Sequence, residues 1–477
     1  MDHSAAPLSK DSRATSPAAL HRHQVNDRRE IFGWMMYDWA NSAFYTTVVS
    51  ALITPYLTFL AQAEVGENGV VLSLGPFGHM TAKSFAFYCF SLSVFLQVFL
   101  LPILGAIADY TNLKKRLMAV FCYTGVASTC LLFFVTGRLY LWGGLLLIIA
   151  NLSFGAAIVF YNAFLSEIAT EDRRDKVSSR GWAFGYLGGG LLLAVNLVLV
   201  SGAEQIGISK ALAVRLSLLS AGLWWGGFAA ITFTRLKTRA AARHLPPGKS
   251  YLTVAFSELF ATLRELGKLR HTLRFLIGYL LYNDGIQTVI MAATVIVEQE
   301  LFISRGLEPD RSLLLGILLM VQFVGVGGVL LFERIAAAAG TKNAILLSLL
   351  LWSGVIIYTY IALQTVTQAW VLGGLIALVL GGSQALSRSL FSRMIPAGRE
   401  ASFFGIYEIS ERGTSWLGPL IFALVVDATN SYRQAILSLI VFFVAGMLVL
   451  LFTDTDKAVR DAGNPLPQEI ESASQPV

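Results

Sequence analysis

The sequence predicts an all-α integral membrane protein with twelve transmembrane helices in two pseudo-symmetric halves of six. Composition is the first reason: of 477 residues, 55% are hydrophobic and 14% are charged, whereas a soluble domain carries about 25% charge. The second reason is that apolar windows of about 20 residues, long enough to cross the hydrocarbon core, recur along the chain. So much apolar surface is expected to be buried in a bilayer.

Twelve apolar segments are expected to span the membrane, and a polar stretch separates the sixth from the seventh. The segments are 32–61, 85–108, 117–136, 139–165, 178–201, 214–232, 273–297, 312–332, 344–363, 369–390, 403–426 and 433–452. This pattern divides the chain into a first half at 32–232, a central loop at 233–272 and a second half at 273–453. Residues 1–31 and 454–477 are polar and are expected to be disordered tails.

The distribution of lysine and arginine predicts the orientation in the membrane. If the N-terminal tail is cytoplasmic, that side carries 28 of these residues, the opposite side carries 7, and Arg412 inside a helix completes the 36. Cytoplasmic loops are enriched in lysine and arginine. Both termini are therefore expected in the cytoplasm, with the protein in the cell membrane.

The central loop is expected to contain an amphipathic helix. Apolar residues that include Leu259, Phe260 and Leu263 recur at helical spacing, and Arg264 and Lys268 lie among them. This pattern is typical of a helix on the inner membrane surface. A helix that binds a partner protein is the alternative.

Polar side chains inside the apolar segments predict a substrate cavity. A charged side chain at the membrane centre costs roughly 2.5–3.5 kcal/mol on insertion scales, so it persists where it faces protein or water. The residues expected to line the cavity are Asp38, Asn41 and Tyr45 of the first segment, Asn151, Tyr161 and Asn162 of the fourth, Asn283, Asp284 and Gln287 of the seventh, Gln384 of the tenth, and Glu411 and Arg412 of the eleventh. Charges of both signs suit a zwitterion, whose carboxylate needs a cation and whose amine needs an anion.

Three carboxylates inside the segments are candidates for proton coupling: Asp284, Asp38 and Glu408. Each also has a structural alternative. Asp38 lies near the inner face, where a gate or a helix tether fits as well as substrate contact does. Glu408 and Arg412 are four residues apart, the spacing of an intrahelical ion pair. Such a pair is either structural or part of a substrate site.

The chain carries no enzyme signature. It has no phosphate-binding G-x-x-x-x-G-K-[ST] loop and no His/Cys cluster with metal-ligand spacing. The basic loops follow from membrane topology and not from nucleic-acid binding. We therefore expect no enzyme activity, no cofactor, no metal and no nucleic-acid partner. The expected partners are a small-molecule substrate, the lipid bilayer and protons, and the expected state is a monomer.

The two halves form a weak internal repeat. Asp38 and Asp284 each lie in the first segment of their half, and Gly105 to Asp109 ends the second segment just before Lys114-Lys115-Arg116. Residues 332–342 occupy the corresponding place in the second half. Parallel halves of this kind are typical of transporters, with the substrate path at their interface.

Several motifs resemble those of a known family. Gly105, Asp109, Lys115 and Arg116 resemble the loop motif of the major facilitator superfamily, which implies that they form a conformational latch. Tyr37-Asp38-Trp39-Ala40-Asn41-Ser42-Ala43-Phe44 resembles the helix 1 signature of the vacuole-effluxer-like branch of that superfamily, and so do residues 180–190 and 403–419. The resemblance covers the membrane region. It implies the major facilitator fold and secondary transport by alternating access; fungal members of the branch are associated with amino-acid efflux from the vacuole.

The expected function is secondary active transport of a small polar solute across the cytoplasmic membrane, with an amino acid favoured and protons as a coupling ion. A drug or peptide exporter is the alternative within the class, although Tyr186 replaces the proline of the helix 5 motif in drug–proton antiporters. A non-transporting receptor or scaffold is the alternative from another class.

Overall fold

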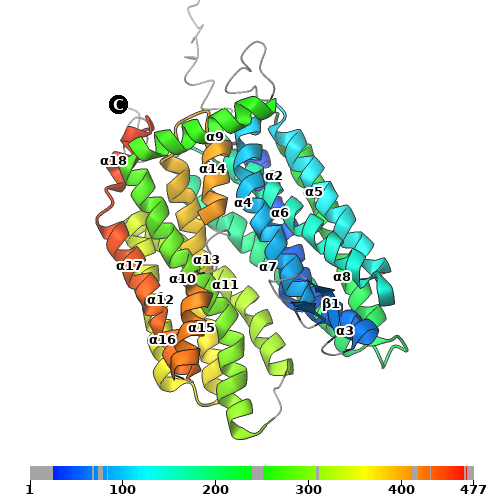
Figure 1. The fold of residues 1–477 in the computed structure, drawn as a ribbon. Helices are drawn as coiled ribbons and strands as arrows, with labels where there is room; N and C mark the ends of the chain where they lie inside the picture. Colours follow the sequence, from blue (N-terminus) through cyan, green and yellow to red (C-terminus); the bar gives the residue numbers. More distant parts are fainter. Residues whose placement is uncertain are drawn as a thin grey trace, which may run out of the picture.

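The structure is a computed structural model, described for residues 25–66, 69–73, 79–82, 84–110, 112–238, 251–307, 311–410, 417–429, 431–466 and 469. It is helical almost throughout (Figure 1). Within these ranges, 11 helices are long and apolar enough to cross a membrane. The predicted fold class is therefore confirmed. The predicted segment 403–426 contains two shorter helices, and residues 411–416 between them lie outside the described part, so the count of twelve stays a prediction.

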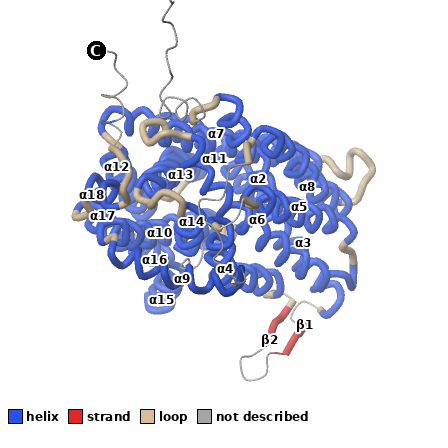
Figure 2. The backbone as a smooth tube through the Cα atoms, turned by 90° about the horizontal axis from the view of Figure 1, so that it is seen from above, coloured by secondary structure: helices blue, strands red, loops and turns tan. Residues whose placement is uncertain are grey.

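The first half begins with a continuous helical run of three parts: α2 (Arg28–Ala43), the π-helix η1 (Phe44–Leu52) and α3 (Ile53–Val65). It continues with α4 (Phe85–Asp109), α5 (Lys114–Leu131), the short 3-10 turns η3 (Leu132–Phe134) and η4 (Gly137–Leu139), α6 (Tyr140–Ile168), α7 (Arg174–Ser201) and α8 (Lys210–Arg235). Between α3 and α4, β1 (Val70–Ser73) pairs antiparallel with β2 (His79–Thr81), with Val70 opposite Thr81 and Ser73 opposite His79. This small hairpin projects from the edge of the bundle (Figure 2).

The second half follows the same plan. Its elements are α10 (Arg270–Leu301), the 3-10 turn η5 (Ile303–Arg305), α11 (Arg311–Ala339), α12 (Thr341–Ala362), α13 (Val366–Arg393), α14 (Glu400–Glu408), α15 (Leu417–Thr429), α16 (Tyr432–Ser438) and α17 (Ile440–Leu451). Seen from above, α2–α8 and α10–α17 form two groups of helices side by side (Figure 2).

Helix α9 (Tyr251–Lys268) lies across one end of the bundle, where α4 and α14 also end or begin (Figure 1). This is the helix expected in the central loop. Leu266 is buried, whereas Phe260 and Leu263 are exposed. An apolar outer face on a helix at the end of a membrane bundle is consistent with a position at the bilayer surface.

The boundaries of the two tails differ from prediction. The first helix begins at Arg28, and α18 (Thr455–Asp461) lies where disorder was expected from residue 454. Asp454 caps α18 by accepting a hydrogen bond from the Lys457 N–H, and the Asn464 amide donates to the carbonyls of Arg393 and Ile395. The prediction is therefore wrong for residues 454–466, because polar composition does not reveal a cap or a tertiary contact.

The halves approach closely through glycines. A Cβ at Gly105 of α4 would lie 2.2 Å from the carbonyl oxygen of Ala401, and one at Gly190 of α7 would lie 2.7 Å from Gln322 of α11. Small residues at such positions allow two helices to approach each other closely. The halves are in contact at the α9 end, and their ribbons diverge toward the opposite end (Figure 1).

Candidate substrate site between the two halves

A buried arginine of the second half is held by groups of the first half. Arg388 of α13 is 5% exposed. Its Nε donates to the Ser178 hydroxyl and its Nη2 donates to the Ser178 carbonyl, both at 2.9 Å, on α7. The same Nη2 lies 3.5 Å from Oδ2 of Asp38 on α2. A buried ion pair thus joins α13 to the first half.

Asp38 is fixed from a second side by Tyr161 of α6, whose hydroxyl donates to Oδ2 of Asp38 at 2.6 Å. Space for the carboxylate exists because residue 181 of α7 is glycine. A Cβ there would lie 2.5 Å from Oδ2 of Asp38 and 3.3 Å from Nη2 of Arg388. The Trp34 ring would lie 2.9 Å from the same Cβ, so the charge pair and the ring together require glycine at this position.

Aromatic rings enclose the guanidinium of Arg388. Its Cζ lies 4.9 Å from the ring centre of Trp34, 5.6 Å from that of Tyr161 and 5.7 Å from that of Trp182. Trp34 and Tyr161 stack on each other with centroids 4.4 Å apart. Ring faces attract a cation and exclude water, so they orient the guanidinium and strengthen its electrostatic interactions.

Glu408 brings a second carboxylate to this place. It belongs to α14 and is fully buried. The Asn162 amide donates to Oε1 of Glu408 at 2.7 Å, and Nη1 of Arg388 lies 3.4 Å from Oδ1 of Asn162. We call Asp38, Tyr161, Asn162, Arg388 and Glu408 the Arg388 cluster. One cation from α13 and two carboxylates from α2 and α14 meet in it, together with the two polar side chains of α6.

A neutral polar patch adjoins the cluster on the second half. Gln384, one turn before Arg388 on α13, donates to Oδ1 of Asn283 on α10 at 3.4 Å. Tyr282 and Ser387 share a hydrogen bond of 2.6 Å between the same two helices. The amides and hydroxyls of these four residues offer hydrogen-bond donors and acceptors next to the charged groups of the Arg388 cluster.

Asp284 faces a different neighbour. Its Oδ2 accepts a hydrogen bond from the Gly418 N–H of α15 at 2.9 Å. Its Oδ1 is buried and has no hydrogen-bond partner in the part of the chain that the structure describes. The geometry therefore links Asp284 to the start of α15 and leaves one carboxylate oxygen available for a further partner.

Two other predicted cavity residues, Asn151 and Tyr45, contact neighbours outside the cluster. The Asn151 amide donates to Ser93 of α4 at 2.7 Å, which is an interhelical contact within the first half. Tyr45 is 44% exposed and packs on Phe154. Asn41 is buried and Gln287 is half-buried. Glu411 and Arg412 lie outside the described residues, so the Glu408–Arg412 pair stays a prediction.

Sequence reasoning missed Ser178 and Trp34. Arg388 was expected with Gln384 and Ser387 on the polar face of the segment 369–390, because an arginine inside an apolar segment is itself a functional signal. Ser178 and Trp34 gave no such signal, since serine and tryptophan are common at the ends of spanning segments.

Two of the four predicted latch residues, Gly105 and Asp109, lie at the contact between the two halves of the protein. The Asp109 carboxylate accepts hydrogen bonds from the Ala401 N–H at 3.1 Å, the Ser402 N–H at 2.8 Å and the Ser402 hydroxyl at 2.6 Å. It thereby caps the N-terminus of α14, where a negative charge is favourable. Gly105 allows the close approach described above. Lys115 instead donates to the Leu236 carbonyl, and Arg116 is exposed.

Further charged contacts join the halves at the α9 end. Arg393 pairs with Asp175 at 2.7 Å, and Arg174 donates to the Ser392 carbonyl at 2.8 Å. Arg399, just before α14, pairs with Glu258 and Glu265 of α9. Glu258 also accepts a hydrogen bond from Tyr110 at the end of α4. Helix α9 therefore bridges the two halves.

Two helical halves with a buried charge cluster between them define a membrane transporter of the major facilitator superfamily. The fold is similar to that of the human organic anion transporter MFSD10, with a TM-score of 0.65 and 13% identity over 89% of this chain and 99% of that chain. It is also similar to the proton:xylose symporter XylE, with a TM-score of 0.62 and 14% identity over 94% and 100% of the two chains.

Within the superfamily, the chain belongs to the family described as "Vacuole effluxer Atg22 like", which matches residues 26–173 and 166–463. It is 32% identical over 440 residues to the MFS-type transporter YxiO of Bacillus subtilis, covering 91% of this chain and 97% of that protein. It is 26% identical over 565 residues to Autophagy-related protein 22-1 of Aspergillus niger, covering 91% and 90%. The predicted branch is thus confirmed: the protein is a multi-pass membrane transporter and not an enzyme.

Proposed function

We propose that this transporter moves a small zwitterionic solute, an amino acid, across the cell membrane by alternating access, with both termini in the cytoplasm. The observation that carries the proposal is the Arg388 cluster, which places one guanidinium and two carboxylates between the halves. Arg388 would bind the substrate carboxylate, and Asp38 or Glu408 would bind its ammonium group. Two carboxylates beside one guanidinium favour a zwitterion over a simple anion.

Binding would proceed by exchange of ion-pair partners. In this structure Asp38 lies against Arg388. A substrate carboxylate can replace Asp38 there while the substrate ammonium takes up Asp38, so no buried charge is left alone. This matters because an unpaired buried charge costs several kcal/mol. Since the pair joins α2 to α13, the exchange would alter the interaction between the halves and connect binding to their movement.

The contacts at the α9 end support an outward-facing state. The Asp109 cap on α14, the Asp175–Arg393 pair and the contacts of Arg399 with α9 all join the halves there. If that end is cytoplasmic, as the charge bias predicts, these contacts close the inner side and must break before the site opens to the cytoplasm. Rocking of two halves about a central site is the usual transport movement of this architecture.

Proton coupling is a further part of the proposal. Asp38, Glu408 and Asp284 are buried carboxylates within the membrane region. Buried carboxylates in spanning helices commonly serve as proton carriers. Asp284 is our first candidate because its Oδ1 faces no hydrogen-bond donor among the described residues, while Asp38 and Glu408 are engaged in the cluster.

Thermal unfolding of the purified protein in the presence of ligands tests the substrate class. A ligand that binds the folded state stabilises it, by about 2.7 kcal/mol at roughly 100 times its Kd. We expect stabilisation by one or more amino acids, and none by the same compounds with the carboxylate amidated or the amine acetylated. Hits should also exchange across proteoliposomes. Stabilisation by the amidated or acetylated compounds, or by no amino acid in a complete panel, would overturn the proposal.

A further inference from the structure

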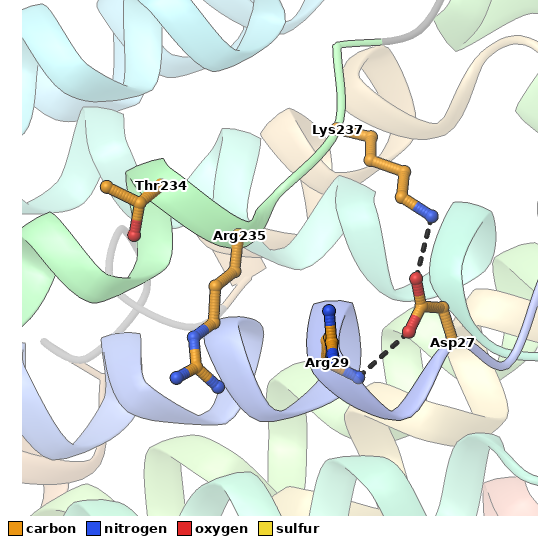
Figure 3. A pocket seen from close by; sticks show the side chains of 5 residues that line it. All are labelled: Asp27, Arg29, Thr234, Arg235 and Lys237. Atoms are coloured by element: carbon orange, nitrogen blue, oxygen red, sulfur yellow. Dashed lines mark hydrogen bonds and ion pairs between the residues drawn. The ribbon is translucent and has the colours of Figure 1, made fainter.

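An open pocket lies at the α9 end of the first half, between the start of α2 and the end of α8. Asp27, Arg29, Thr234, Arg235 and Lys237 line it, and its volume is about 610 Å³ (Figure 3). It is separate from the Arg388 cluster. It lies where two spanning helices reach the membrane surface, so its polar contents face the headgroup region.

The pocket has an excess of positive charge. Asp27 accepts hydrogen bonds from Lys237 Nζ at 2.7 Å and from the Arg29 N–H at 2.9 Å (Figure 3). The Lys237 hydrogen bond, followed by that of the Arg29 N–H, lowers the pKa of Asp27 below its usual value, so this carboxylate stays ionised at neutral pH. The lining residues carry three cations and one anion, and the buried Glu30 carboxylate accepts a hydrogen bond from the Lys237 N–H at 3.0 Å, so the local formal charge is +1. Among the described residues, Arg29 and Arg235 have no ion-pair partner.

An aromatic face continues from the pocket toward the membrane centre. It consists of five partly exposed rings from α2, α7 and α8: Phe32, Trp39, Phe184, Trp224 and Phe228. The guanidinium of Arg235 lies 4.7 Å from the ring centre of Phe32, which contacts Phe184 at 6.1 Å. Phe184 contacts Trp39 at 6.4 Å, and Trp39 stacks on Trp224 at 5.6 Å. The contacts form one unbroken chain that begins at a cation.

The length of this face fits one membrane leaflet. Trp224 lies eleven residues before Arg235 on α8. At 1.5 Å per residue, the two are about 16 Å apart along the helix. Half of a hydrocarbon core is about 15 Å thick. A cationic end and an apolar face of that length match the headgroup and the acyl chain of one lipid.

We propose that this surface binds one anionic phospholipid of the leaflet at the α9 end. Arg29, Arg235 and Lys237 would hold its phosphate, and an acyl chain would lie along the aromatic face. Basic pockets at the membrane edge bind anionic headgroups in this way. The lipid would contact α2 and α7, the helices that carry Asp38 and Ser178. It would therefore stabilise the helices that carry the first-half residues of the Arg388 cluster.

Native mass spectrometry of the purified protein tests the charged end. The protein is mixed with equal amounts of dioleoyl phosphatidylglycerol and dioleoyl phosphatidylcholine, which differ in headgroup charge and share their chains. We expect the anionic lipid to be retained preferentially. Each cation near an anionic headgroup contributes about 1 kcal/mol, which is roughly fivefold in affinity. The double variant Arg235→Gln/Lys237→Gln should therefore lose roughly 25-fold in preference.

Arg334→Gln is the matched control, because Arg334 is an exposed arginine near the end of α11, outside the pocket. It should keep the wild-type preference. No preference in the wild type, or an equal loss in the control, would overturn the proposal. Retention of the zwitterionic lipid by the double variant serves as the check that its fold is intact.

Chain length tests the aromatic face. Dihexanoyl phosphatidylglycerol has the same headgroup but chains too short to follow the face, and glycerol 3-phosphate has none. We expect both to compete poorly with the dioleoyl lipid. Phe228→Ala should weaken binding of the dioleoyl lipid and leave the preference for the anionic headgroup unchanged. Full competition by glycerol 3-phosphate would mean that the pocket binds a free phosphate compound, and the lipid proposal would then be wrong.

Discussion

Separating Asp38 from Arg388 should destabilise the protein in a way that the double variant partly reverses. The two charged atoms lie 3.5 Å apart, and both residues are buried. At that separation and an effective dielectric constant of about 20, two unit charges attract each other by about 5 kcal/mol. Removing one partner of a buried pair typically costs about 3–5 kcal/mol, because the remaining charge is left without a counter-charge.

Arg388→Gln should therefore lower the melting temperature more than the double variant Asp38→Asn/Arg388→Gln does. The single variant leaves the Asp38 carboxylate without its counter-charge, whereas the double variant removes both charges. Recovery will be incomplete, because Arg388 also contacts Ser178 and Asn162. The assay is thermal unfolding of each purified variant in one detergent. Arg138→Gln is the control: its pair with Glu64 is largely exposed, and such pairs contribute about 0–1 kcal/mol.

The reasoning fails if the effects of the two single variants simply add. Independent sites add to within about 0.5 kcal/mol, whereas residues in one charge network show interaction energies of about 0.5–3 kcal/mol. Additive melting shifts would mean that Asp38 and Arg388 are each stabilised by other groups. The ion-pair exchange proposed for substrate binding would then lose its basis.

Three further predictions concern coupling, the latch and topology. Asp284→Asn should insert and fold normally but abolish pH-driven accumulation of substrate in proteoliposomes. Substrate exchange should persist if Asp284 only carries protons and fail if it binds the amine. Wild-type uptake from mildly acidic to neutral pH would exclude both roles. Asp109→Asn removes the negative charge at the N-terminus of α14, at a cost of about 0.3–1 kcal/mol, so spin labels at Asn112 and Ala397 should show a longer distance component by pulsed EPR; an unchanged distribution would show that the charge does not hold the α9 end closed. A cysteine at Ser12 should react with an impermeant reagent only after the inner side is exposed, and labelling from outside intact cells would reverse the topology.

The residues that form the site illustrate what helical spacing can and cannot predict. Asp38, Tyr161 and Asn162 were expected in a cavity, and the structure brings all three together. Asn151 had the same amide chemistry on the same helix, yet it contacts Ser93 within the first half. Position along a helix predicts which way a side chain points relative to its neighbours. It does not predict whether a polar helix, a cavity or the other half lies in that direction.

The sequence by itself determined the class of protein: its apolar segments must be helices in a membrane, because only internal hydrogen bonding satisfies the backbone there. Its motifs determined the family. Only the tertiary structure decided that Asp38 pairs with Arg388, 350 positions away, and that Gly181 makes room for the pair. It also decided that Asp109 caps α14 while Lys115 binds elsewhere. Such contacts depend on how separate helices pack, and every helix carries polar groups that could pair with several partners until packing brings one of them within reach.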